Sequence, residues 1–207
     1  LGVAAFMGEI SSGVTTMVFN FLILGLTGNT GIAAYGVVAN VALVATAVFN
    51  GISQGSQPLL SDYYGKNDDK SVQKILRLSI ITGIAAAVLI ILVTNLIPDV
   101  IVAVFNNENN AEMASYAVFG VQLYFTGFLF AGFNIIGTGF LSATESAAWA
   151  FITSVLRGFV AISLCALLLS ALFGMTGVWL AFPVAEFITA VLMVIAIAQN
   201  VRKMRTK

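Results

Sequence analysis

The stretch LGVAAFMGEISSGVTTMVFNFLILGL, residues 1–26, decides the fold class of this chain. It is apolar for most of its length and long enough to cross the ~30 Å hydrocarbon core of a bilayer as a helix. Its one charged side chain is Glu9. Because a charge at mid-span costs roughly 2.5–3.5 kcal/mol on insertion scales, Glu9 is a candidate functional residue. Its position about two turns from the start leaves snorkelling to the interface as the alternative.

The composition extends the membrane interpretation to the whole chain. Of the 207 residues, 59% are hydrophobic and only 9% are charged, and the mean hydropathy is +1.01. A soluble domain carries about 25% charged residues, so the charged fraction is too small for a surface in water. The formal net charge is zero and no block of like charge occurs, which argues against a nucleic-acid partner. The chain is predicted to be an integral membrane protein surrounded by lipid.

The residue types that bind metals or form covalent intermediates are almost missing. There is no histidine, and the single cysteine, Cys165, lies in an apolar segment. A disulfide within the chain is excluded, and neither a zinc site nor a haem site is expected. No nucleophile–base pair and no carboxylate pair at helical spacing is found. The chain is therefore predicted not to be an enzyme and to need no metal or cofactor.

Six apolar segments of helical length divide the chain, and short polar or glycine-rich breaks separate them. Continuous apolar runs indicate helices, because membrane strands would alternate over about ten residues. The predicted fold class is an all-α integral membrane protein, a bundle of six transmembrane helices that forms one lobe over residues 1–207. The predicted spans are approximately 2–26, 32–57, 76–97, 114–141, 147–170 and 177–198.

Lysine and arginine residues predict the orientation of this bundle. All but one of the nine lie between the second span and the first turn of the third, or after the sixth, which six spans place on the same side. Positive residues flank the cytoplasmic ends of membrane helices, so both ends of the chain are predicted to be cytoplasmic in the cell membrane. The opposite connections carry only acidic charges, Asp99, Glu108 and Glu112. The basic residues on the predicted cytoplasmic side are Lys66, Lys70, Lys74, Arg77, Arg202, Lys203, Arg205 and Lys207.

Polar residues recur on one face of the first predicted span. Glu9, Ser12, Gly13, Thr16 and Asn20 follow one another at helical spacing and form a stripe. A membrane helix turns such a stripe toward protein or a water-filled cavity.

Two other spans carry comparable faces. One face of the second span carries Asn40, Ala47, Asn50, Gln54 and Gln57 and is interrupted by Leu43. Gly127 and Asn134 share a small-and-polar face of the fourth span. Small residues allow helices to approach closely. Single amides in membrane helices often only bond a neighbouring helix, which is the simpler interpretation of each of them. Together the three faces predict that three helices offer polar groups to a common interior.

Two charged residues interrupt the fifth and sixth predicted spans. Trp149 and Trp179 mark opposite membrane interfaces, and Arg157 and Glu186 follow them by about eight and seven residues. At 1.5 Å per residue the two charges lie ~12 Å and ~10 Å deep from opposite faces. In a ~30 Å core this leaves ~8 Å between them along the membrane normal. Arg157 and Glu186 are therefore predicted to form an intramembrane pair that locks these two spans together.

Three stretches of the chain form a pattern in a fixed order. The first, residues 40–76, contains GISQGSQPL followed by YYGK. The second is ATESAAWAFITSVLRGF, residues 143–159, which includes Arg157, and the third is FGMTGVWLAFPVAEF, residues 173–187. Together they resemble the multidrug and toxic compound extrusion (MATE) family of transporters. The resemblance covers nearly the whole chain and is greatest to the bacterial branch typified by MepA-like exporters.

The resemblance implies an architecture larger than this chain. MATE transporters have twelve helices in two six-helix halves, and this chain is similar to the C-terminal half. Its partner would then be the N-terminal half, with the substrate between the two lobes. A first residue Leu1 in place of methionine fits the expectation of a fragment.

The resemblance also implies a function, which is H⁺- or Na⁺-coupled antiport that exports organic cations or drugs by alternating access. In the family a carboxylate in the helix that matches the first span often takes part in coupling, and Glu9 occupies that position. Some branches have a second acid in the helix matching the fourth span, whereas this chain has Asn134 near that level. The candidate coupling and transport residues are Glu9, Asn20, Asn40 and Asn134.

Two other functions stay open on the sequence alone. A lipid or oligosaccharide flippase of the same superfamily would usually carry more arginine and lysine inside its cavity, whereas Arg157 is the one basic residue within a span. A non-transporting membrane module that only assembles with a partner is the other alternative.

Overall fold

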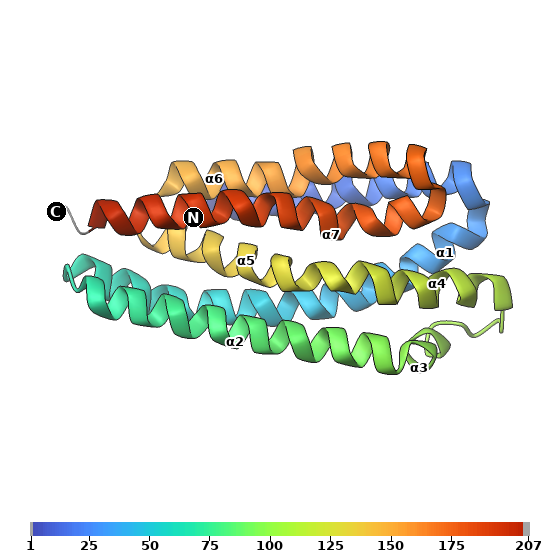
Figure 1. The fold of residues 1–207 in the computed structure, drawn as a ribbon, viewed down its shortest axis with the longest axis horizontal. Helices are drawn as coiled ribbons and strands as arrows, with labels where there is room; N and C mark the ends of the chain where they lie inside the picture. The colour runs from blue at the N-terminus through green and yellow to red at the C-terminus, as the bar shows by residue number, and fades with distance from the viewer. Residues whose placement is uncertain (1, 205–207) are drawn as a thin grey trace.

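The computed structural model describes the backbone of residues 2–204 and the side chains of residues 13–204. Long helices lie along a common axis and strands are absent from this described part (Figure 1). The α-helices are α1 (Gly2–Gly65), α2 (Asp69–Leu96), α3 (Pro98–Ala103), α4 (Ala111–Tyr124), α5 (Phe128–Ala143), α6 (Ala147–Val155) and α7 (Ile162–Met204). A 3₁₀ turn, η1 (Phe125–Gly127), joins α4 to α5, and a π-helix, η2 (Leu156–Ala161), joins α6 to α7.

Glycine interrupts the two longest helices. Gly28 in α1 has φ 65° and ψ −153°, and Gly174 in α7 has φ 58° and ψ −134°. Glycine adopts positive φ readily because it lacks a Cβ atom. At both places the ribbon reverses its direction at the right-hand end of the molecule (Figure 1). Both glycines fall in breaks between predicted spans, at 27–31 and 170–177.

Four helical stretches of the described residues are long and apolar enough to cross a membrane. They comprise residues 13–65, 69–96, 111–143 and 147–204. This confirms the predicted class, an all-α membrane protein. The first and last of these stretches contain the reversals at Gly28 and Gly174.

Helix boundaries differ from the predicted spans where helices leave the apolar region. Helix α1 continues to Gly65, beyond the predicted end of the second span at residue 57. A fall in hydropathy ends a membrane segment, but a helix can continue into water because its backbone bonds are internal. The short helix α3 was not predicted, and Pro98 occupies its first turn, where a missing N–H has no cost.

The tight connection between α1 and α2 is fixed by Asp68. Its side chain caps α2 by accepting hydrogen bonds from the Ser71 hydroxyl (2.6 Å) and the Ser71 backbone N–H (3.1 Å). These bonds favour the charged carboxylate and lower the pKa of Asp68 below its usual value. The cap places the basic first turns of α2 beside the end of α1.

Glycines on α4 and η1 allow close packing against α7. A Cβ atom on Gly120 would lie 2.8 Å from the Trp179 ring, and one on Gly127 would lie 2.8 Å from the Cα atom of Pro183. Such distances are shorter than ordinary contacts, so only glycine fits at this helix crossing. The small residues predicted on the fourth span therefore do allow close approach, as expected.

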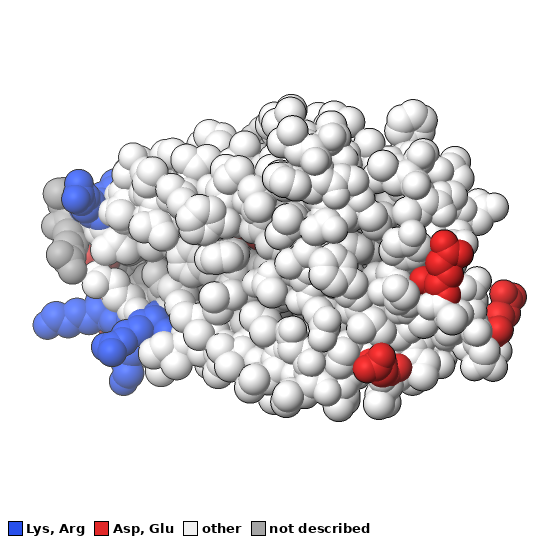
Figure 2. All heavy atoms as spheres, turned by 45° about the vertical axis from the view of Figure 1, so that its right-hand side comes forward, with Lys and Arg blue, Asp and Glu red and all other residues white. Residues whose placement is uncertain are grey.

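Charged side chains gather at the two ends of the molecule. In the view of Figure 2, basic side chains lie at the left end and acidic ones stand out at the right end, with a wide uncharged zone between them. The left end contains the start of α2 and the end of α7, and the right end contains α3 and the start of α4 (Figure 1). This separation of charge matches the sequence analysis, and the side that faces the cytoplasm stays a prediction.

Replacing Gly127 with alanine is expected to destabilise the helix bundle by about 1–3 kcal/mol, because the added methyl group overlaps the backbone of α7. Thermal unfolding of the purified protein in detergent measures the change. Gly51→Ala is the matched control, since a Cβ atom on Gly51 has no described atom within 4 Å. Equal stability of the two variants would contradict this account of the helix crossing.

Candidate functional site

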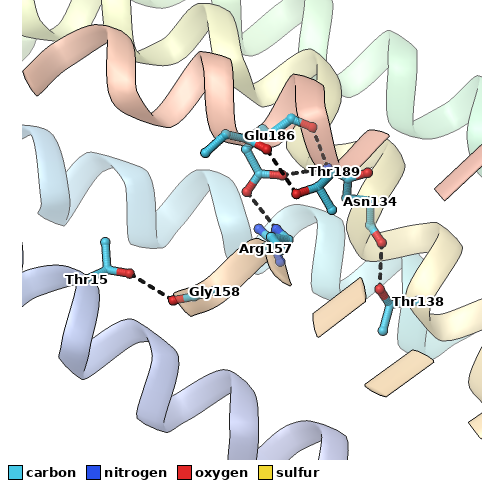
Figure 3. A network of polar contacts seen from close by, with 8 residues as sticks. Thr15, Asn134, Thr138, Arg157, Gly158, Glu186 and Thr189 are labelled. Atoms are coloured by element: carbon cyan, nitrogen blue, oxygen red, sulfur yellow. Dashed lines mark hydrogen bonds and ion pairs between the residues drawn. The ribbon is translucent and has the colours of Figure 1, made fainter. Parts of the chain in front are cut away.

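A charged pair lies inside the bundle between η2 and α7. The Arg157 Nε atom donates a hydrogen bond to Glu186 Oε1 at 2.6 Å (Figure 3). The Glu186 side chain is 4% exposed, whereas that of Arg157 is 28% exposed. The contact predicted between these two residues is therefore present and direct, and the pair reaches the surface of the lobe only through Arg157.

Asn134 of α5 completes the coordination of Glu186 from the opposite side. Its Nδ2 atom donates to Glu186 Oε2 at 2.7 Å and to the Glu186 backbone carbonyl at 2.9 Å. Asn134 is fully buried. Because both partners are acceptors, they fix the orientation of the amide. Its Oδ1 atom points elsewhere and has no hydrogen-bond donor among the described residues.

Threonine hydroxyls satisfy backbone carbonyls next to these residues. Thr138 donates to the carbonyl of Asn134 at 2.9 Å, and Thr189 donates to the carbonyl of Ala185 at 2.9 Å. Such bonds to the preceding turn pair a hydroxyl that would otherwise be costly inside a membrane. These two hydroxyls are thus held within their own helices, which leaves the carboxylate of Glu186 for Arg157 and Asn134.

The π-helix η2 sets the position of Arg157. A π-turn widens the helix by one residue and changes the direction of the side chains that follow it. One turn of α1 packs against it, and Thr15 donates a hydrogen bond to the carbonyl of Gly158 at 3.2 Å (Figure 3). The site therefore unites α5, η2 and α7, with α1 as a support.

Aromatic side chains cover the pair on the side of α4. The rings of Tyr124 and Phe182 stack with centroids 4.2 Å apart, and the Phe128 ring lies 5.2 Å from that of Phe182. Phe182 lies one turn before Glu186 on α7, and the Glu186 side chain is itself buried. In a water-poor site the charge depends on its two donors, and removal of one partner of a buried pair typically costs about 3–5 kcal/mol.

The predicted coupling residues occupy three different environments. Glu9 lies outside the residues whose side chains the structure describes. Asn20 is half-buried, and Asn40 is exposed and donates to the carbonyl of Gly36 on its own helix at 2.8 Å. Asn134 is buried within the lobe. The expectation that Asn40 and Asn134 face a common interior of this lobe is therefore wrong, because α1 turns its amide-bearing face outward.

The contact between Asn134 and Glu186 is not among the predictions from the sequence, which place Asn134 with the candidate coupling residues and apart from the charged pair. The sequence does contain a pattern that indicates this contact. Gly127, Ala131, Asn134 and Thr138 form the small-and-polar face of the fourth predicted span, and this face packs on the helix that carries Glu186. An amide in the middle of such a face is a natural partner for a charge on the helix that it touches.

A bundle of long apolar helices with a hydrogen-bonded ion pair inside it defines a multi-pass membrane protein. The MatE family model matches residues 4–167, so the chain belongs to the MatE family. It is 30% identical over 194 residues to the multidrug export protein MepA of Staphylococcus haemolyticus and 29% identical over 192 residues to MepA of Staphylococcus saprophyticus. These matches cover 93% and 92% of this chain but 41% of each relative. The chain thus spans less than half the length of these relatives, which supports the predicted half of a MATE transporter.

Solved structures of MATE transporters share this fold. An outward-facing multidrug resistance MATE transporter superposes with a TM-score of 0.94 over 100% of this chain and 46% of its own, at 11% sequence identity. The Vibrio cholerae transporter VcmN in its bent form gives a TM-score of 0.89 over 98% of this chain and 46% of its own, at 15% identity. At such low identity the likeness establishes the fold alone.

Reversing one charge, by Arg157→Glu or Glu186→Arg, is expected to destabilise the protein by about 3–5 kcal/mol, because a buried charge loses its partner. The double variant is expected to recover much of that loss, because the charges again oppose each other. Thermal unfolding and expression level in the membrane measure the effect. A double variant no more stable than either single variant would show that the pair does not hold these helices together.

Proposed function

We propose that this chain is one six-helix lobe of a MATE exporter that releases organic cations or drug-like compounds across the cell membrane by alternating access. Cation-coupled antiport, with H⁺ or Na⁺ entering as the compound leaves, would supply the energy. The other six-helix half would close a cavity against this lobe. Family membership and the multidrug-export names of its MepA relatives support this proposal.

One observation carries the proposal, and it is the set of amides that α1 exposes after Gly28, among apolar residues such as Leu43 and Val44. Asn40, Asn50 and Gln54 follow one another along one face of the helix, and all three are exposed. The exposed side of α2 instead consists of residues such as Leu89 and Leu92. Amides on a helix within the membrane are costly against lipid, so this face calls for a protein or water partner. A second lobe with an aqueous path between the two supplies both.

The six-span count and the orientation form part of the proposal. If each reversal, at Gly28 and at Gly174, separates two spans, the four apolar stretches become six crossings. With six crossings both ends of the chain lie on the same side. The basic ends of α2 and α7 would then face the cytoplasm under the positive-inside rule.

Coupling is proposed to begin at Glu9, with Asn20 on the same stripe of the first span and Asn40 on the wall of the cavity. A carboxylate in a water-poor site takes up a proton or a cation because its bare charge is costly there. Asn134 adds an acceptor, Oδ1, beside the Glu186 carboxylate. That acceptor suits a protonated group or a cation that arrives during the transport cycle.

The Glu9→Gln variant of the full-length transporter is expected to lose coupled export while it still binds substrate, because glutamine cannot take up and release a proton. Efflux of a fluorescent organic cation from proteoliposomes is measured under a proton gradient and, separately, under a Na⁺ gradient. Glu108→Gln is the matched control, because it removes the same charge from an exposed position outside the apolar stretches.

Loss of gradient-driven efflux in Glu9→Gln but not in Glu108→Gln would support Glu9 as the coupling group. The gradient that drives efflux by the wild-type protein identifies the coupling ion. If the Glu9→Gln variant exports the compound as fast as wild type, Glu9 is not the coupling group, and Glu186 is the next residue to test. A wild-type protein that transports no organic cation under either gradient would overturn the antiport proposal itself.

A further inference from the structure

A groove of about 510 Å³ opens between the first turns of α2 and the end of α7, at the basic end of the molecule. Five of the six lining residues come from α2 and one comes from α7, and the lining mixes aliphatic side chains with one amide and one cation. The lining residues are Gln73, Leu76, Arg77, Ile80, Ile81 and Val201.

The cation in this groove, Arg77, lies where a bilayer would pass from headgroups to hydrocarbon. Helix α2 has 28 residues and is about 42 Å long, which exceeds a ~30 Å hydrocarbon core. Its charged residues all lie at or before Arg77, and the segment from Leu78 to Leu96 carries none. That segment spans roughly 28 Å, so it fills the core and leaves Arg77 at the boundary.

The guanidinium of Arg77 is available to a ligand. Arg77 is exposed, and within the described part of the chain no ion pair or hydrogen bond engages its side chain. Among the lining residues Arg77 is the one cation, and the exposed residues Arg202 and Lys203 follow Val201 in the sequence. A planar guanidinium suits two oxygens of a phosphate.

The apolar part of the groove continues toward the middle of the membrane. Ile81 shares its face of α2 with Ile84 and Val88, which are 52%, 44% and 45% exposed. On α7, Val194 is 56% exposed and lies two turns before Val201 on the same face. The groove thus opens onto apolar surface and not onto the amide face of α1, so its outer neighbour is lipid.

A second groove at the opposite end of the molecule provides a built-in comparison. It measures about 400 Å³ and lies between α3 and α4. Its one charged lining residue is Asp99, so it repels an anion. The two grooves are similar in size and lie at opposite ends of α2, but their charges are opposite.

We infer that the α2–α7 groove is a binding site for one anionic phospholipid, whose phosphate contacts Arg77 and whose acyl chain lies along Ile81 and Val201. Charge complementarity at the basic end and the apolar continuation along both helices select this ligand over a soluble anion. Basic pockets between membrane helices are known to hold anionic headgroups. The bound lipid would bridge α2 and α7 and stabilise the lobe at this end.

Native mass spectrometry of the full-length transporter in detergent tests the inference, with phosphatidylglycerol and phosphatidylcholine titrated separately. Wild type is expected to retain one phosphatidylglycerol more tightly than any phosphatidylcholine. Arg77→Gln is expected to weaken that binding about fivefold, which corresponds to one basic residue at an anionic lipid surface. Arg77→Lys is expected to recover part of it, because it keeps the charge but loses the two-pronged contact.

Lys66→Gln is the matched control, because Lys66 is a cation at the same end of the molecule that does not line the groove. An equal loss of phosphatidylglycerol affinity in Lys66→Gln and Arg77→Gln would mean that the lipid is held only by diffuse electrostatic attraction, and it would overturn the site. Equal affinity for the two lipids in wild type would also overturn it, as would displacement of the lipid by millimolar inorganic phosphate. Ile81→Ser, which leaves every charge in place, is expected to weaken phosphatidylglycerol too, and an unchanged affinity there would contradict the acyl-chain contact.

Discussion

The burial of one carboxylate, Glu186, constrains the interior of this protein. A bare charge inside a membrane bundle would cost far more than the folded state can tolerate, so the carboxylate must meet donors on both of its oxygens. Arg157 and Asn134 provide them, at 2.6 and 2.7 Å. Since those residues come from η2 and α5, a single group on α7 fixes how three elements approach one another. The π-turn at η2 and the glycines along α4 and η1 can be understood as the geometry that permits this approach.

The close approach has its own requirement, which is the absence of side chains at the helix crossings. Gly120 and Gly127 allow Trp179 and Pro183 to lie against α4 and η1 with no space for a methyl group. Helices in lipid have no hydrophobic driving force between them. The glycine contacts and the hydrogen bonds among Glu186, Arg157 and Asn134 (the polar trio) are therefore the main sources of specificity in helix packing. They act at neighbouring levels of α7, because Trp179, Pro183 and Glu186 lie within about two turns. A change at the glycine crossings therefore displaces the hydrogen bonds of Glu186, and a change in those bonds displaces the crossings.

Much of the fold was predictable because the bilayer restricts the possibilities. A spanning segment must be a long apolar helix, and charges must gather at its ends, so composition and spacing alone indicate the class. Depth counted from Trp149 and Trp179 paired Arg157 with Glu186, and the contact is present. Trp179 itself is fully buried and packs against Gly120, so the interpretation of Trp179 as an exposed interface marker was wrong. The partner of Asn134 was not predictable in the same way, because depth says nothing about which way a helix is rotated. For the same reason Asn40 and Asn134 were assigned to one interior, although Asn134 is buried inside the lobe and Asn40 lies on its surface.

Three kinds of surface on one lobe follow from these constraints. The exposed side of α2 is aliphatic and suits acyl chains, whereas the face of α1 with Asn40, Asn50 and Gln54 carries amides that lipid cannot satisfy. The basic groove at Arg77 lies where the aliphatic surface meets the headgroups. If the lobe moves against a second lobe across the amide face, the lipid-facing helices α2 and α7 must move with it as one body. A phospholipid that bridges α2 and α7 would oppose their separation. The polar trio holds α7 to η2 and α5, so the lobe would rotate without losing its packing.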